Sequence, residues 1–149
     1  MAVRNVPGDV FQVPLTPGMH GYAQWLADGT ARFFLRSTGS ALSVEEAISL
    51  PLAFRVAVFK DTPGRYGWSK IGKASISSDC LAPQRFAKRD PLSGALSIFV
   101  DGNEQPATPA EIEGLETAAV WAHPHLIERL NSQLVGTESQ FLRSLRIAI

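Results

Sequence analysis

The stretch LETAAVWAHPHLIERLNSQL, residues 115–134, decides how this chain folds. Its apolar run at residues 118–121 favours a buried strand, although periodicity alone also allows a helix. Pro124 suits the first turn of a helix, because the N–H groups of that turn have no partner inside the helix. With Gly136 placed to end it, this helix is expected to dock on a core, and Trp121 is expected to anchor the strand before it. The apolar residues of the helix recur at helical spacing: Leu126, Ile127, Leu130 and Leu134.

Two charged residues of the same stretch are spaced to join the strand to the helix. Glu116 precedes the apolar run, and Arg129 lies in the helical segment. We expect them to form a buried or half-buried ion pair, and removing one partner of a buried pair costs about 3–5 kcal/mol. The pair is therefore predicted to belong to the frame of the fold.

The overall composition is typical of a globular protein. The chain has 149 residues, of which 45% are hydrophobic and 19% charged, and it is predicted to form one domain over residues 1–149. Its single cysteine, Cys80, excludes an internal disulfide and fits a reducing compartment. The N-terminal residues show no signal-peptide pattern, and no apolar run is long enough to span a bilayer. We therefore expect a cytoplasmic protein with no membrane contact.

The first third of the chain predicts an antiparallel meander of three strands, at residues 10–15, 20–27 and 31–35. The dipeptide Asp28-Gly29 lies between the last two strands. It is a strong hairpin signal, because both residues tolerate a positive φ.

The rest of the chain adds more short strands and little helix. The alternating apolar residues of the tail, at residues 145–149, favour a final edge strand, and capping-box patterns at Ser43 and Thr108 predict short helical turns. The predicted fold class is mainly β (α+β), as a strongly bent antiparallel sheet or small barrel with one C-terminal helix packed on it. The further strands are predicted at residues 52–59, 65–71, 83–87 and 95–100.

The formal net charge is zero, but the charges are separated along the chain. Residues 55–89 contain eight Lys or Arg against two acidic residues, whereas residues 101–128 contain six acidic residues and no Lys or Arg. A basic block can bind nucleic acid or an acidic protein surface, or it can simply face solvent. Arg and Tyr are enriched among residues that dominate binding energy, so we predict a partner-binding face in residues 65–73 and 84–90. Its members are Arg65, Tyr66, Arg85, Lys88 and Arg89.

Patterns for catalysis or metal binding are weak. His123 and His125 lie close together with Glu128 one helical turn later, but two histidines and one carboxylate fall short of a metal-ligand set. Cys80 has no local nucleophile signature, and no glycine-rich loop of the phosphate-binding type leads into a helix. We expect no enzyme activity, no metal and no cofactor.

Three stretches together resemble the immunity protein 26 family of bacterial polymorphic-toxin systems. They are GDVFQVPL with GYAQWL (residues 8–15 and 21–26), GWSKIG (67–72), and GLETAAVW with HLIERL (114–121 and 125–130). The resemblance implies a mostly β cytoplasmic protein, encoded beside a toxin, that neutralises the toxin by binding it. It also implies a link to nuclease-type toxins, and it implies no catalytic residues.

Two function classes follow. The favoured one is a toxin-neutralising protein that inhibits by steric occlusion. The alternative is a small β-barrel that binds nucleic acid, because the basic block is interleaved with aromatic residues of the kind that stack on bases. These aromatic residues are Phe59, Tyr66, Trp68 and Phe86.

Overall fold

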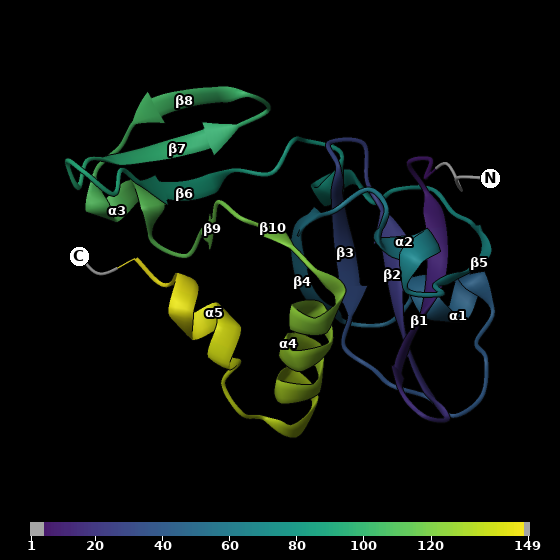
Figure 1. The fold of residues 1–149 in the computed structure, drawn as a ribbon. Coiled ribbons are helices and arrows are strands. Elements are labelled where there is room, and N and C mark those ends of the chain that lie inside the picture. Colours follow the sequence, from purple (N-terminus) through teal and green to yellow (C-terminus); the bar gives the residue numbers. More distant parts are fainter. Residues whose placement is uncertain (1–4, 148–149) are drawn as a thin grey trace.

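The computed structural model describes residues 5–147, which form two β-sheets with helices beside them (Figure 1). The larger sheet has six strands in the order β10-β4-β3-β2-β1-β5, and the smaller has four in the order β8-β7-β6-β9. The strands of the larger sheet are β1 (Asp9–Thr16), β2 (Met19–Trp25), β3 (Thr30–Phe34), β4 (Leu52–Val58), β5 (Ser69–Lys73) and β10 (Val120–Trp121). Those of the smaller sheet are β6 (Phe86–Arg89), β7 (Leu96–Val100), β8 (Asn103–Pro106) and β9 (Glu116–Thr117). The helices are α1 (Val44–Ile48), α2 (Thr62–Arg65), α3 (Pro109–Ile112), α4 (His123–Val135) and α5 (Gln140–Leu145), with a 3-10 turn at Ser78–Cys80.

The α+β class is confirmed, but the single bent antiparallel sheet or small barrel is wrong. Both sheets are open, and both are mixed, because β10 pairs with β4 and β9 pairs with β6 in parallel. In the larger sheet, β10 and β5 form opposite edges and do not pair with each other. After β5 the chain leaves this sheet to build the smaller one, and it returns through residues 116–121. Strands of two residues carry no readable periodicity, so the sequence could not reveal these two parallel pairings.

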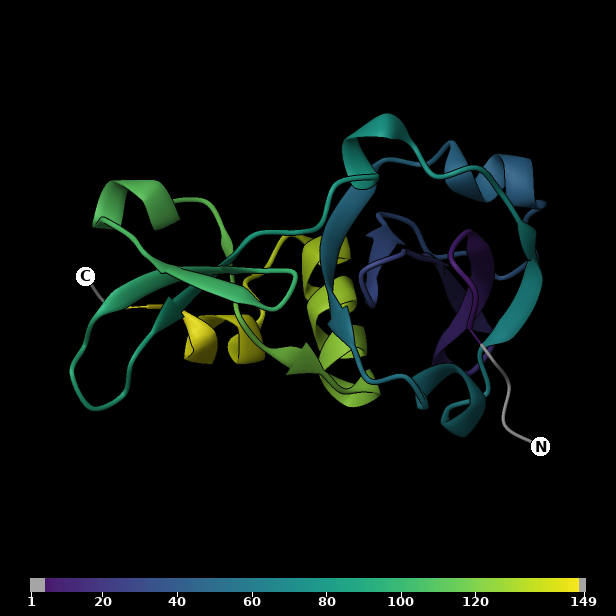
Figure 2. The ribbon, with the colours of Figure 1, turned by 90° about the horizontal axis from the view of Figure 1, so that it is seen from above.

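One face of the larger sheet is apolar and packs against α4, as the organising stretch predicted. Pro124 lies in the first turn of α4, and Gly136 ends the helix with a left-handed φ of 80°. Trp121 is only 1% exposed, and it packs with the buried stripe of α4, including Leu126 and Leu130. Figure 2 shows α4 between the larger sheet on one side and the smaller sheet with α5 on the other.

The opposite face of the larger sheet carries polar side chains that bind one another. Arg32 Nε donates to Gln24 Oε1 at 2.8 Å, and Arg32 Nη1 donates to Ser77 Oγ at 3.1 Å. Gln24 Nε2 donates to the carbonyl of Ala74 at 3.0 Å. The loop of residues 74–84 is therefore held on this face before the chain enters β6.

The tail folds as α5 and not as the predicted edge strand at residues 145–149, of which 148 and 149 lie outside the described residues. Ser139 caps α5, and Glu128 of α4 accepts hydrogen bonds from Ser139 Oγ at 2.6 Å and from the N–H of Phe141 at 3.1 Å. The ring of Phe141 then packs edge-on against Trp121, with 4.8 Å between centroids. These helix-starting bonds and this core contact outweigh the strand-like alternation of the tail.

The predictions of individual turns and helix caps were more accurate than the prediction of the overall architecture. Asp28 and Gly29 join β2 to β3, and both capping boxes, at Ser43 and Thr108, are present. The strand expected at residues 65–71 begins later, at Ser69, because the preceding residues form α2. Among the helices in the described part of the chain, none combines the length and the hydrophobicity needed to cross a bilayer.

Trp121→Ala is expected to lower the free energy of unfolding by about 3–5 kcal/mol, because it removes a large buried aromatic ring from the contact between sheet and helix. Urea denaturation measures this change. Val120→Ala is the matched control, since Val120 is 50% exposed one residue away and its replacement is expected to cost about 0.5 kcal/mol or less. Equal losses for the two variants would contradict the anchoring role of Trp121.

Candidate functional site

An apolar groove of about 310 Å³ lies between the two sheets. Its floor and walls come from β4, from β6 and β7, and from residues 118–120 of the returning chain. The lining is apolar apart from one lysine: Ala57, Phe86, Lys88, Phe99, Ala118, Ala119 and Val120.

The alternation of β4 and its pairing with β10 create one wall of this groove. Val56 and Val58 point into the core, so Ala57 and, directly after the strand, Phe59 point to the other face. Val120 is the register partner of Ala57 and shares its face. Phe59 and Val120 are 49% and 50% exposed, which leaves two large apolar side chains open to solvent on neighbouring strands.

The smaller sheet supplies the other wall. Phe86 of β6 lies directly opposite Phe99 of β7, so both rings stand on one face of the sheet. Lys88 stands on the same face and forms an ion pair with Glu104 of β8 at 2.8 Å. Ala87 points to the opposite face and packs there in a separate core.

A second hollow, of about 200 Å³, lies where the chain leaves β4, between Phe59 and the start of α4 at Ala122. Tyr66 lines it and stacks on His123, with 4.5 Å between ring centroids and 14° between planes. The guanidinium of Arg65 lies 5.7 Å from the centre of the Tyr66 ring, a cation–π contact. Phe59 lines this hollow and Ala57, two residues earlier in the chain, lines the groove, so the two depressions are neighbours, and we call them together the strip.

His123 connects this strip to the core. Trp68 Nε1 donates a hydrogen bond to His123 Nδ1 at 3.0 Å, and Trp68 is 7% exposed. Burial lowers the pKa of His123, because the charged imidazolium loses hydration there. The fold therefore favours the neutral form of His123, in which the Nδ1 lone pair accepts the hydrogen bond from Trp68.

The five residues predicted for a contact face fall into two groups. Arg65 and Tyr66 lie at one end of the strip, and Lys88 lies in the groove at the other end. Arg85 directly precedes β6 and Arg89 ends it, and by alternation both lie on the face of Ala87, where Arg89 lies next to Gly94. The structure therefore brings the first three onto one strip and turns the other two away from it.

Sequence reasoning missed the apolar part of the strip. Ala57, Phe99 and Val120 read as ordinary interior residues of strands, and their exposure depends on how distant elements pack. One signal was available for Val120. In a strand, its neighbour Trp121 points inward, so Val120 must point outward.

The residues considered for metal binding have other partners. Nδ1 of His123 accepts from Trp68, and Glu128 accepts hydrogen bonds from Ser132 and from the start of α5. Within residues 5–147 no three His, Cys, Asp or Glu side chains are grouped closely enough to hold a metal ion.

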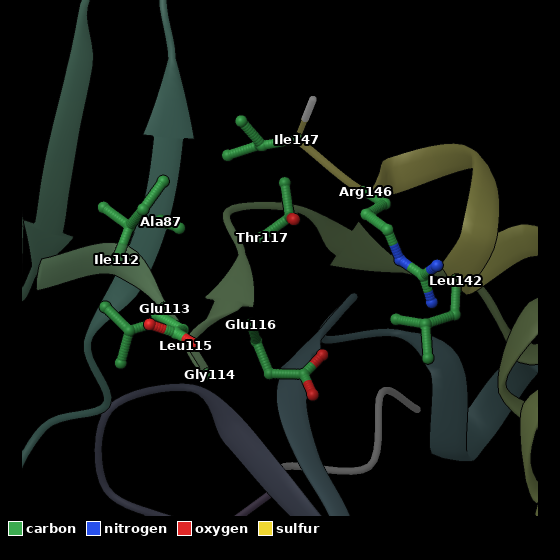
Figure 3. A pocket seen from close by; sticks show the side chains of 10 residues that line it. All are labelled: Ala87, Ile112, Glu113, Gly114, Leu115, Glu116, Thr117, Leu142, Arg146 and Ile147. Carbon is green, nitrogen blue, oxygen red and sulfur yellow. The ribbon is translucent and has the colours of Figure 1, made fainter. Parts of the chain in front are cut away.

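Another hollow, of about 300 Å³, lies on the opposite face of β6, where Ala87 lines it (Figure 3). Figure 3 shows Ile112 on one side of it and Leu142 and Arg146 on the other, with Glu116 between them. Arg146 and Glu116 both form ion pairs within the chain. Two of its three charged side chains are therefore already paired within the chain, and Glu113 is the third.

The nucleic-acid alternative finds little support in the arrangement of the aromatic residues. Trp68 and Phe86 are each only 7% exposed, so neither presents a ring face on which a base stacks. The predicted barrel that this alternative required is also absent from residues 5–147.

Comparison with protein families identifies the family to which the chain belongs. A model of the immunity protein 26 family matches residues 6–95, more than half of the sequence, and the chain belongs to this family. It is an immunity protein of a polymorphic-toxin system, a class of non-enzymatic proteins that bind their cognate toxins. Comparison with curated proteins and with solved structures gives no significant match.

Acidification is expected to destabilise the protein through His123. The pKa of His123 is near 6.5 in the unfolded chain, and it is lower in the folded protein. As pH falls below about 6.5 the unfolded state therefore takes up the proton first, and the stability from the neutral ring, fully present above that pH, is lost as pH falls toward the folded pKa. Denaturation of the parent and of His123→Asn, measured between about pH 5 and pH 8, checks this prediction. The difference in unfolding free energy between them should shrink toward low pH, and a constant difference would contradict it.

Proposed function

We propose that this immunity protein neutralises its toxin by steric occlusion, with the strip from Tyr66 to Lys88 as the toxin-binding surface. The observation that carries the proposal is the exposure of Phe59 and Val120 beside an open apolar groove, in a member of a toxin-binding family. Large apolar side chains that stay half exposed in an otherwise well-packed sheet lose their contact with water when a partner covers them.

Charged and aromatic groups at the two ends of the strip support the same surface. Arg65 and Tyr66 are residue types that dominate binding energy in protein interfaces, and both are prearranged by the stack on His123. Lys88 and Glu104 bring both signs of charge to the groove, which favours one orientation of the partner and speeds its association. The strip thus combines an apolar centre with a polar rim, the usual anatomy of an interface.

We further propose that the toxin is a nuclease. The family resemblance motivates this proposal, and the acidic side chains of the β7–β8 hairpin support it. Glu104 is exposed and pairs with Lys88 of the groove, and Asp101 is exposed at the turn of the same hairpin. A nuclease carries a basic surface for the phosphate backbone, and these carboxylates complement such a surface. The corresponding test is whether the cognate toxin cleaves nucleic acid and whether one equivalent of this protein stops the cleavage.

We also propose that the chain acts as one domain, 1–149, in the cytoplasm. Residues 116–121 pair with both sheets, which supports a single unit. The single cysteine is consistent with a reducing compartment.

Reversing the charges at Arg65 and Lys88 together is expected to weaken toxin binding by about tenfold or more, because both side chains border the proposed strip. Affinity for the purified cognate toxin and survival in a co-expression assay measure the effect. Both side chains are exposed, so the folded structure should be retained.

The matched control is the charge reversal of Arg85 and Arg89, which changes the net charge equally on the opposite face of β6. This variant should protect as well as the parent. If it loses protection while Arg65→Glu/Lys88→Glu keeps it, the toxin binds the α3 side of the smaller sheet and the proposed surface is wrong.

A further inference from the structure

The chain crosses between the larger sheet and the smaller one at two points, and each point holds an Arg–carboxylate pair. The first precedes β6, where the chain passes from the larger sheet to the smaller. The second lies at β9, from which the chain returns. Between them, residues 86–117 form β6 to β9 and α3.

The first pair joins Arg55 of β4 to Asp28 of the β2–β3 hairpin. Arg55 Nη2 lies 3.0 Å from Asp28 Oδ2 and also donates to the carbonyl of Ala82 at 3.1 Å. Asp28 Oδ2 accepts from the N–H of Gln84 at 2.8 Å, and Gln84 Nε2 donates to the carbonyl of Arg55 at 2.7 Å. Both charged side chains are about nine-tenths buried, at 13% and 12% exposed. The pair therefore holds the backbone immediately before β6.

Asp28 is ionised in this arrangement. Burial raises the pKa of its carboxyl group, but hydrogen bonds from Thr30 and Gln84 and the charge of Arg55 outweigh this effect and lower the pKa overall. The contact to Gln84 is therefore a charge-assisted hydrogen bond at neutral pH.

The second pair joins Arg129 of α4 to Glu116 of β9. Arg129 Nη1 and Nη2 donate to the two carboxylate oxygens of Glu116 at 2.8 and 2.7 Å. The guanidinium lies over the rings of Phe54 and Trp121, at 4.2 and 5.1 Å from their centroids. Arg129 is thereby fixed in the core of the larger sheet, and its two-point contact sets the direction of β9, the neighbour of β6.

We infer that these two pairs are positioning pairs that set the placement of the smaller sheet and so the width of the toxin-binding groove. This inference rests on the proposed function of the groove. An open groove of about 310 Å³ between the sheets means that side-chain packing there is incomplete. Apolar contacts are also non-directional, whereas a bidentate ion pair fixes both distance and angle. The ion pairs at β9 and before β6 thus fix the distance and angle between the sheets, which the incomplete apolar packing does not fix.

The test removes each pair in turn without changing side-chain size. Glu116→Gln and Asp28→Asn are prepared in a Cys80→Ala background with spin labels at positions 69 and 105, which are exposed on β5 and β8. Pulsed electron resonance then reports the distances between the sheets, and titration with the purified cognate toxin reports affinity. Both variants should broaden the distance distribution. If the binding-competent placement falls to about a tenth of the population, affinity falls about tenfold.

Val120→Arg separates failure of this inference from failure of the proposed function. It should abolish toxin binding and leave the distance distribution as in the parent, because it fills the groove without touching either pair. Retained affinity in Val120→Arg would reject the groove as the toxin site. An unchanged distribution in both Glu116→Gln and Asp28→Asn would overturn the positioning role, even if unfolding becomes easier. So would a broadened distribution with parental affinity while Val120→Arg loses binding.

Discussion

The architecture depends on the contact of Arg129 with Glu116 above the ring of Trp121. Through this contact α4, which packs on one face of the larger sheet, also holds β9 of the smaller sheet. Arg129 is only 7% exposed, so its charge would be costly without the carboxylate. The geometry of the ion pair and the packing of the rings must therefore be satisfied together. That double requirement fixes residues 116–121 between the two sheets.

The parts of the fold that sequence could predict are those set by neighbouring residues. The Asp28-Gly29 hairpin, the capping boxes at Ser43 and Thr108, and the end of α4 at Gly136 each need only a few adjacent positions. The Glu116–Arg129 pair was also predictable, because both residues fall within one organising stretch. The existence of two sheets was not, since it depends on β9 and β10 pairing with strands far earlier in the chain.

The candidate site also has a part that depends on local sequence and a part that depends on long-range packing. Arg65 and Tyr66 were chosen from residue type alone, and the end of α2 places them beside the second hollow. Successive residues of β6 point to opposite faces, so Lys88 and Arg89 lie on different faces of the smaller sheet. Counting the basic residues of this segment does not distinguish the two. Alternation next to Trp121 could have shown that Val120 points outward. The rest of the apolar centre could not be predicted, because Ala57 and Phe99 line a groove that exists only where two separately built sheets meet.

This construction separates the frame of the protein from the proposed contact surface. The family match covers residues 6–95, which include five of the six strands of the larger sheet, together with β6. Phe99, in the outer wall of the groove, and the rest of the β7–β8 hairpin lie beyond the matched region. Side chains on that wall contribute little to the core around Trp121, so they can change without unfolding the larger sheet. An immunity protein needs this freedom, because its surface must fit one particular toxin while its frame stays intact. A groove between the larger sheet, which carries the core around Trp121, and a smaller sheet outside that core meets both requirements.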